Sequence, residues 1–262
     1  MRICLTNDDG IYARGLSMLK VELEKIADVY VIAPDRERSA SSHSVTMHKP
    51  LRVQPVNFEK AQANSWAASG TPADCVKLAL EIFLDHPPDL LVSGINRGAN
   101  LGTDVFYSGT VSAAIEGLIH GIPSLAISVT AVEDEKVNYR YAADFAKRLC
   151  QKIFCNRLPF DTLLNVNIPN LPENEIKGVK ITKLGWRRYV NAVHERQDPR
   201  GRKYYWLAGS VADISPEPDS DITAIADSMV SITPVFFDLT NHRVIEQVKG
   251  WFETLSQEPA KP

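Results

Sequence analysis

Two adjacent carboxylates follow the first predicted strand of the chain. Asp8 and Asp9 lie in the segment Asn7–Gly10, directly after the β-rich run Arg2–Thr6. Ligands of an open α/β sheet gather at the carboxyl ends of its strands. Two carboxylates placed there repel each other, and a divalent cation would offset that repulsion. The pair therefore suggests a site for Mg²⁺, Mn²⁺ or Ca²⁺, although an Asx-type turn at Asp-Gly explains these residues at least as well by itself.

Two later loops offer neutral oxygen ligands. Ser39 lies in the serine-rich loop after the buried strand Val29–Ala33, and Asn96 lies in the glycine-rich loop after the strand Leu90–Ser93. The carboxyl ends of parallel strands meet at one edge of a sheet, so these side chains are expected beside the two acids. Mg²⁺ keeps water molecules in its shell, and one of them could be a nucleophile.

A candidate phosphate cradle opens the next predicted helix. Ser108, Gly109 and Thr110 precede an apolar helical segment. Free backbone N–H groups and the helix dipole favour an anion at such a position. The simpler interpretation is that Thr110 serves only as the helix N-cap, and both can hold at once.

Several charged side chains are weaker candidates for a functional role. His43 could act as a general acid or contact phosphate, but a lone loop histidine is more often solvated. Arg36 and Arg38 could attract an anionic substrate or be equally solvated. Arg187 and Arg188 are most simply part of a solvated face.

Strands and helices alternate in the first half of the chain, which indicates a mostly parallel sheet with helices on both faces. Strands are predicted at Arg2–Thr6, Val29–Ala33, Leu51–Val56, Ser65–Ala68, Leu90–Ser93, Ser124–Val129, Leu163–Ile168, Val179–Leu184 and Val230–Pro234. Helices are predicted at 16–26, at 71–84, from Thr110, at Val137–Phe154 and at Val244–Leu255.

The second half of the chain departs from this alternation. Trp186–Val193 and Lys203–Ala208 flank the turn signal Asp198–Gly201, which predicts a long hairpin suited to subunit contacts. We expect one domain over 1–262, in which 1–170 is the α/β core with the active site. Residues 171–262 then supply the hairpin and the terminal helix for oligomerisation.

Composition limits the classes of protein. The chain has 262 residues, is 44% hydrophobic and carries a net charge of -3, which gives no case for a nucleic-acid polymer or an anionic membrane as partner. No apolar run approaches a membrane span, and no signal peptide is evident. The four cysteines, at 4, 75, 150 and 155, do not match metal or redox spacing. Reduced thiols and a cytoplasmic location are therefore expected.

Five segments follow one another in a characteristic order: Thr6–Ile11, Ala33–Ser42, Ser69–Val76, Asp89–Asn100 and Tyr107–Gly117, with later matches at Leu164–Pro169 and Ser231–Pro234. In this order they resemble the SurE family, the survival-protein-E nucleotidases. The resemblance implies a Rossmann-like three-layer fold and a metal-dependent phosphatase acting on nucleoside 5′-monophosphates, and often on 3′-monophosphates. It also implies one divalent metal ion per subunit, and dimers or tetramers that exchange the C-terminal region.

The resemblance also maps functional residues onto this sequence. The implied metal ligands are Asp8, Asp9, Ser39 and Asn96. The candidate phosphate contacts are Ser39, Asn96, Ser108, Gly109 and Thr110. The candidate catalytic residues are Asp8, Asp9, Asn96, Ser108 and Thr110.

The mechanism expected from these residues is direct attack by a metal-activated water, with Asp8 or Asp9 taking its proton. A phospho-aspartate intermediate is the rival route, and the absence of Asp-x-Asp after the first strand argues against it. A non-catalytic module that senses a nucleotide or phosphate is the alternative function.

Overall fold

A nine-stranded sheet forms the centre of the computed structural model, which describes residues 1–58, 64–131, 137–159, 161–191, 193–207, 209–213 and 217–252. The strand order is β3-β4-β2-β1-β5-β6-β7-β13-β8. The strands are β1 (Arg2–Thr6), β2 (Asp28–Pro34), β3 (Val53–Pro55), β4 (Ser65–Ala68), β5 (Leu90–Arg97), β6 (Ser124–Thr130), β7 (Leu163–Pro169), β8 (Val179–Ile181) and β13 (Val230–Val235). The strands from β4 to β7 in this order pair in parallel, whereas β3 and β13 join antiparallel to β4 and β7. The predicted mostly parallel sheet is confirmed.

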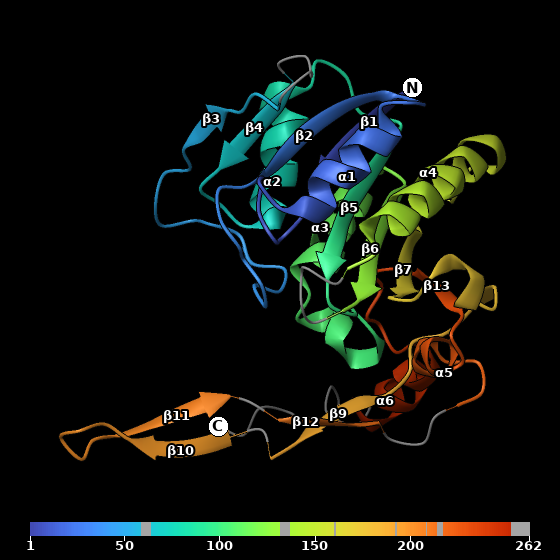
Figure 1. The fold of residues 1–262 in the computed structure, drawn as a ribbon. Helices are drawn as coiled ribbons and strands as arrows, with labels where there is room; N and C mark the ends of the chain where they lie inside the picture. Colours follow the sequence, from blue (N-terminus) through green and yellow to red (C-terminus); the bar gives the residue numbers. More distant parts are fainter. Residues whose placement is uncertain are drawn as a thin grey trace, which may run out of the picture.

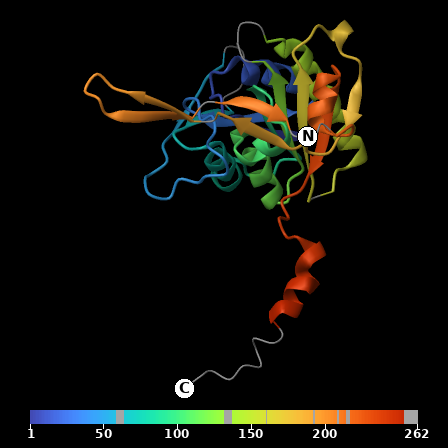
Figure 2. The ribbon, with the colours of Figure 1, turned by 90° about the horizontal axis from the view of Figure 1, so that it is seen from below.

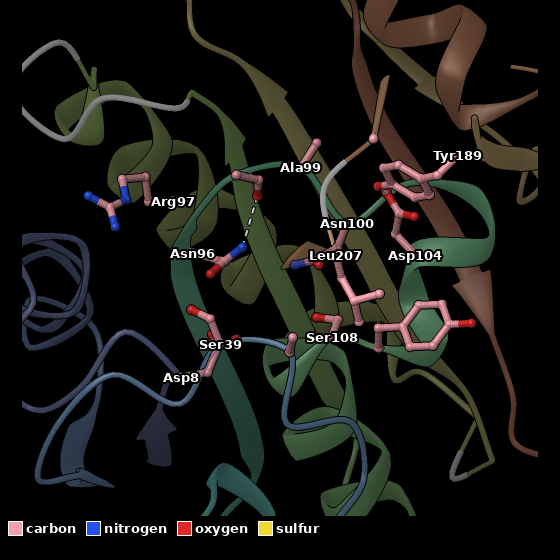
Figure 3. Close-up of a pocket in the computed structure, with 14 residues that line it drawn as sticks. Asp8, Ser39, Asn96, Arg97, Ala99, Asn100, Asp104, Ser108, Tyr189 and Leu207 are labelled. Atoms are coloured by element: carbon pink, nitrogen blue, oxygen red, sulfur yellow. Dashed lines mark hydrogen bonds between the residues drawn. The ribbon is translucent and has the colours of Figure 1, made fainter. Parts of the chain in front are cut away.

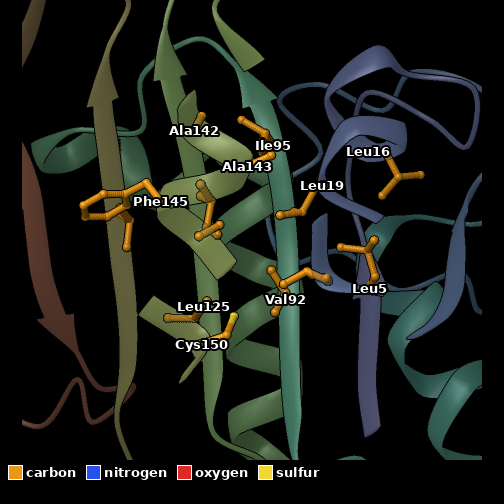
Figure 4. Packing of buried hydrophobic residues seen from close by; sticks show 14 of the residues in the cluster. Leu5, Leu16, Leu19, Val92, Ile95, Leu125, Ala142, Ala143, Phe145 and Cys150 are labelled. Carbon is orange, nitrogen blue, oxygen red and sulfur yellow. The ribbon is translucent and has the colours of Figure 1, made fainter. Parts of the chain in front are cut away.

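Helices cover both faces of the sheet and make three layers (Figure 1). They are α1 (Arg14–Leu23), α2 (Pro72–Leu78), α3 (Gly109–Ile119) and α4 (Tyr139–Asn156). Successive residues of a strand point to opposite faces, so Leu5 packs with α1 and α4 while Cys4 packs with α2 and α3. Figure 4 shows the first of these clusters, in which Leu16 and Leu19 of α1 and Phe145 of α4 lie over one face of the sheet. These two apolar layers hold the strand ends that carry the site.

The predicted helix over 71–84 is correct at its start and changes form near its end. Thr71 Oγ1 accepts from the backbone N–H of Asp74 at 3.1 Å, and the Asp74 carboxylate accepts from the Thr71 N–H at 2.9 Å. This capping box fixes the first turn. The α-helix ends at Leu78, and a π-helical turn continues over Ala79–Phe83.

The C-terminal region projects from the sheet (Figures 1 and 2). It contains β9 (Arg187–Val190), β10 (Val193–Gln197), β11 (Lys203–Leu207), β12 (Ser210–Asp213), α5 (Asp221–Ala226) and α6 (Ile245–Phe252). The predicted hairpin exists, but its pairing was wrong: β11 pairs with β10, and β9 pairs with β12. The ladder therefore includes the four-residue strand β12, which lies beyond the predicted strand and ends at Asp213. Short α5 was not predicted, and residues 253–255 of the predicted terminal helix lie outside the described residues.

The cysteines are all free, and three of the four are buried. Among the described residues, no helix has both the length and the apolar character needed to cross a membrane.

Candidate active site

The carboxyl ends of three neighbouring strands meet at one cleft (Figure 3). Asp8 follows β1, Ser39 follows β2, and Asn96 stands near the end of β5. These three residues and Ser108 line a cleft of about 750 Å³. The structure therefore brings together residues that are distant in the sequence, as parallel topology predicted. One boundary differs: β5 runs on to Arg97, so Asn96 lies in the strand and not in the loop predicted from Gly94.

Asn7, and neither acid, closes the turn after β1. Its side-chain amide donates to the Gly10 carbonyl at 3.0 Å, and its side-chain oxygen accepts from the Gly10 N–H at 3.2 Å. The interpretation that one of the acids closes an Asx-type turn is therefore wrong, because Asn7 closes it. Asp8 and Asp9 are left to other contacts, which favours a role for them in the cleft.

Asp8 is a buried carboxylate held against the start of α3. Only 4% of the residue is exposed, and its Oδ1 accepts from the Thr110 hydroxyl at 2.5 Å. Burial raises the pKa of Asp8, and the Thr110 bond opposes that rise. The Thr110 hydroxyl therefore orients this acid, and the N-cap interpretation of Thr110 is wrong.

Asp9, like Asp8, is a carboxylic acid whose pKa is raised. Burial, followed by repulsion from Asp8, raises the pKa of Asp9 to about 7, while its Oδ2 accepts from the Arg97 N–H at 3.1 Å. Asp9 lines a smaller cavity of about 190 Å³ with Arg14, Glu37 and Arg97, beside the main cleft. Asp9 thus lines the smaller cavity and not the larger one, whereas Arg97 lines both.

Ser39 and Asn96 present oxygen atoms near the acids. The Ser39 hydroxyl donates to Glu37 Oε1 at 2.7 Å. The Asn96 amide nitrogen donates to the Gly98 carbonyl at 2.9 Å, which leaves its oxygen pointing toward Ser39 in Figure 3. Glu37 was missed by sequence reasoning, and its charge raises the pKa of both Asp8 and Asp9.

This donor set fits a hard divalent cation. Among the described residues, neither Asp8 nor Asp9 forms a salt bridge, and the charge of Arg97 lowers the pKa of Asp9 by less than burial and the charge of Asp8 raise it. No group of three or more His, Cys, Asp or Glu is arranged for a metal in that part of the chain. A cation here would therefore rely on two carboxylates and on neutral oxygens, which is the pattern that Mg²⁺ and Ca²⁺ accept.

The start of α3 has the features of an anion site. Ser108 is the N-cap, because its hydroxyl accepts from the Val111 N–H at 3.1 Å, and the helix begins at Gly109. Ser41, which sequence reasoning did not single out, has a buried hydroxyl with no hydrogen-bond partner in the part of the chain that the structure describes. It lies 3.0 Å from the position that a Cβ on Gly109 would take. An unsatisfied hydroxyl beside a helix N-terminus suits a phosphate oxygen.

The serine-rich loop is fixed by contacts outside the cleft. His43 Nε2 lies 2.7 Å from Glu116 Oε2, and Lys77 and His120 also contact this buried carboxylate. Burial raises the pKa of Glu116, but the hydrogen bonds and charges of His43 and Lys77 together outweigh it and leave that pKa lowered to about 2. The solvated interpretation of His43 is therefore wrong, and the histidine anchors the loop that carries Ser39.

Two arginines also differ from expectation. Arg38 donates to the Ser69 carbonyl at 2.8 Å and lies 3.5 Å from Asp35, so it turns back onto the sheet edge. Arg187 pairs with Asp104 at 3.1 Å and is not part of a solvated face.

Buried asparagines position the glycine-rich loop. The Asn100 carbonyl accepts from Asn165 at 2.8 Å and from Asn167 at 3.0 Å, and the Asn100 N–H donates to Asn167 at 2.8 Å. The side chain of Asn100 reaches Ser128 at 2.8 Å. Buried networks of this kind favour one loop conformation, although the side-chain oxygen of Asn165 has no hydrogen-bond partner among the described residues. They fix the loop that follows Asn96.

Fold and site together define a doubly wound α/β enzyme whose candidate active site lies at the carboxyl edge of a parallel sheet. A family model described as Survival protein SurE matches residues 3–191. The chain belongs to the SurE family, as the sequence motifs predicted.

Relatives and solved structures agree with this assignment. The "5'-nucleotidase SurE" of Heliobacterium modesticaldum is 52% identical over 251 residues, which are 96% of this chain and 92% of that protein. The "5'-nucleotidase SurE" of Moorella thermoacetica is 53% identical over 255 residues, 97% of each chain. The crystal structure of the SurE protein from Aquifex aeolicus superposes with a TM-score of 0.83 at 40% identity, covering 96% of this chain and 99% of that one. The predicted SurE fold is confirmed.

Proposed function

We propose that this chain is a metal-dependent phosphomonoesterase that hydrolyses nucleoside 5′-monophosphates, and 3′-monophosphates as well. The names of its relatives support the 5′-nucleotidase activity. One observation of the structure carries the proposal: the buried Asp8 carboxylate meets the first residues of α3, through Thr110 and the Gly109 backbone. A cation held by the acid and a phosphate held by the helix would therefore be neighbours.

Different residues of the site would bind the metal ion and the phosphate. Asp8, Asp9, Ser39 and Asn96 would hold one divalent ion per subunit. When bound, that ion supplies charge neutralisation for the phosphate and polarises the attacking water. The backbone N–H groups at the start of α3, with Ser108 and Ser41, hold phosphoryl oxygens as their charge spreads. Ser39 and Asn96 lie beside this proposed position of the phosphate.

Proton transfer belongs to the acid pair. In the metal-free protein, burial and the charge of Asp8 raise the pKa of Asp9 to about 7. Each acid accepts one hydrogen bond, Asp8 from the Thr110 hydroxyl and Asp9 from the Arg97 N–H, so the proton of the attacking water could pass to either of them. A labelled phosphoprotein trapped on Asp8 would instead establish the phospho-aspartate route.

Phosphate release from nucleoside monophosphates tests the proposed function. With AMP and added Mg²⁺ or Mn²⁺, we expect steady release of phosphate. Chelation with EDTA should lower the rate by about 10³-fold, and excess metal should restore it, because the ion provides several kcal/mol of transition-state stabilisation. AMP binding without metal-dependent phosphate release would favour the sensing module instead.

We infer that the C-terminal region, 171–262, mediates assembly into dimers or tetramers by exchange, while 1–170 holds the catalytic residues. Phe236, Phe237, Leu239 and Trp251 are exposed, and α6 extends away from the rest of the described chain (Figure 2). Apolar surface of this kind is usually covered by a partner. Light scattering should therefore find an oligomer, and a monomer at micromolar concentration would contradict the assembly.

A cytoplasmic location is supported by the free cysteines, since thiols stay reduced in that compartment. Recovery of the protein mainly from a secreted fraction would contradict it.

A further inference from the structure

The cleft has a second wall that the proposed chemistry does not use. Tyr107, Tyr189 and Leu207 line it together with Gly209. Tyr189 comes from β9 and Leu207 from the end of β11, so the hairpin supplies most of this wall. In Figure 3, Tyr189 lies on the opposite side of the cleft from Asp8 and Ser39. One cleft thus joins a polar end to an end rich in aromatic and apolar side chains.

The tyrosine on this wall is held in a fixed orientation. The Tyr189 hydroxyl donates to Asp104 Oδ2 at 2.9 Å, and Arg187 Nη1 donates to the same oxygen at 3.1 Å. The Thr103 hydroxyl donates to the Arg187 carbonyl at 2.5 Å. A tyrosine tethered through its hydroxyl presents its ring with little loss of rotamer freedom on binding.

The wall is also fixed relative to the phosphate cradle. Asp104 lies in the short helical turn Gly102–Phe106, which leads directly into Ser108. Asp221, fully buried, accepts from the N–H groups of Gly102 and Gly185 at 2.8 Å each, and so ties that turn to the base of the hairpin. The distance from the cradle to Tyr189 is therefore set by hydrogen bonds between three segments of the chain.

We propose that Tyr107, Tyr189 and Leu207 form the surface on which the nucleobase of the substrate packs, with Tyr189 as the main specificity determinant. This inference rests on the proposed function. A phosphate cradle by itself accepts any phosphomonoester, whereas a tethered ring in the same cleft selects those that carry a flat aromatic group. Stacking on an aromatic side chain tolerates all bases, because every base has a π-face. The wall therefore distinguishes nucleotides from simple sugar phosphates more than it distinguishes one base from another.

Two substrates that differ only in the base test the proposal. AMP and ribose 5-phosphate share the phosphate and the sugar, and both would reach the same cradle. Tyr189→Ala should lower kcat/KM for AMP by about tenfold, mainly through KM, because the loss of one stacking contact costs about that much. The same variant should change kcat/KM for ribose 5-phosphate by less than about twofold.

Two further variants separate the ring from its surroundings. Tyr189→Phe keeps the ring and removes the bond to Asp104, so it should retain most of the preference for AMP. Tyr204→Ala is the matched control: Tyr204 lies on the same hairpin, is 42% exposed against 44% for Tyr189, and does not line the cleft. It should leave both substrates unaffected.

Equal losses on AMP and ribose 5-phosphate in Tyr189→Ala, or no loss on AMP, would overturn the proposal. A wild-type protein that hydrolyses neither substrate would contradict the proposed function instead. Calorimetric affinities of wild-type and Tyr189→Ala protein for the two ligands would then decide the role of the wall by the same comparison.

Discussion

Asp8→Asn protein is expected to lose about 10³-fold or more in kcat/KM for AMP while remaining folded. The substitution keeps the size of the side chain and the oxygen that accepts from Thr110. It removes one of two carboxylates that would hold the cation, so both metal affinity and stabilisation of the transition state should fall. Phosphate release at saturating Mg²⁺ or Mn²⁺ measures the loss, and calorimetric titration with the metal alone measures the change in affinity.

Although Asp8→Asn protein should be less active than wild type, its metal-free form should be more stable. Burial raises the pKa of Asp8, and burial with the Asp8 charge raises that of Asp9 to about 7. Between about pH 4 and pH 7 the metal-free native state therefore holds protons that the unfolded chain has released, and its free energy of unfolding falls as the pH rises. Removing the Asp8 charge removes much of that cost. In EDTA, the Tm of the variant should exceed that of wild type at pH 8, and the excess should shrink toward pH 5.

Asp35→Asn is the matched control, because Asp35 is an exposed acid at the same sheet edge and does not line the cleft. It should keep wild-type activity and show no comparable gain in stability. Activity that survives in Asp8→Asn protein would remove Asp8 from the candidate site.

The convergence of the site could be predicted because it depends on topology. Buried runs and turn signals placed Asp8, Ser39 and Asn96 after three strands, and parallel pairing then required them to share an edge. The start of α2 was predicted for a similar reason, since the pattern of Thr71, Pro72 and Asp74 is a local signal that tertiary contacts did not override.

The features of the fold and the site that could not be predicted from the sequence depend on contacts between residues that are far apart along the chain. Asn7 and the two acids can all close an Asx-type turn, and the choice was decided by Thr110, which contacts Asp8 across 102 residues. The wall of the cleft was missed because its position depends on Arg187 and Asp104, which are 83 residues apart. Hairpin pairing was wrong for a related reason: exposed strands lack the buried alternation that specifies register.

Gly109→Ala is expected to lower kcat/KM for AMP by about 10²-fold, although alanine favours helix formation over glycine. A Cβ at this position would lie 2.8 Å from Asp8 Cβ, 2.9 Å from Asp8 Oδ2 and 3.0 Å from the Ser41 hydroxyl. The Asp8 side chain is buried and held by Thr110, so it cannot move aside without losing its place in the site. A displacement of about 1 Å between reacting groups is enough to cost about 10²-fold in rate.

The measurement pairs activity with metal affinity, since displacement of Asp8 should weaken both. Gly250→Ala in α6 is the control, because among the described residues no heavy atom other than those of its chain neighbours and of the helix backbone lies within 4 Å of the added methyl group. The contrast between the two substitutions isolates the effect of the steric contact from that of helix propensity, which alanine improves at both positions. Near wild-type activity and metal affinity in Gly109→Ala protein would mean that Asp8 can move without cost, and that the close approach of α3 to this acid does not set the geometry of the site.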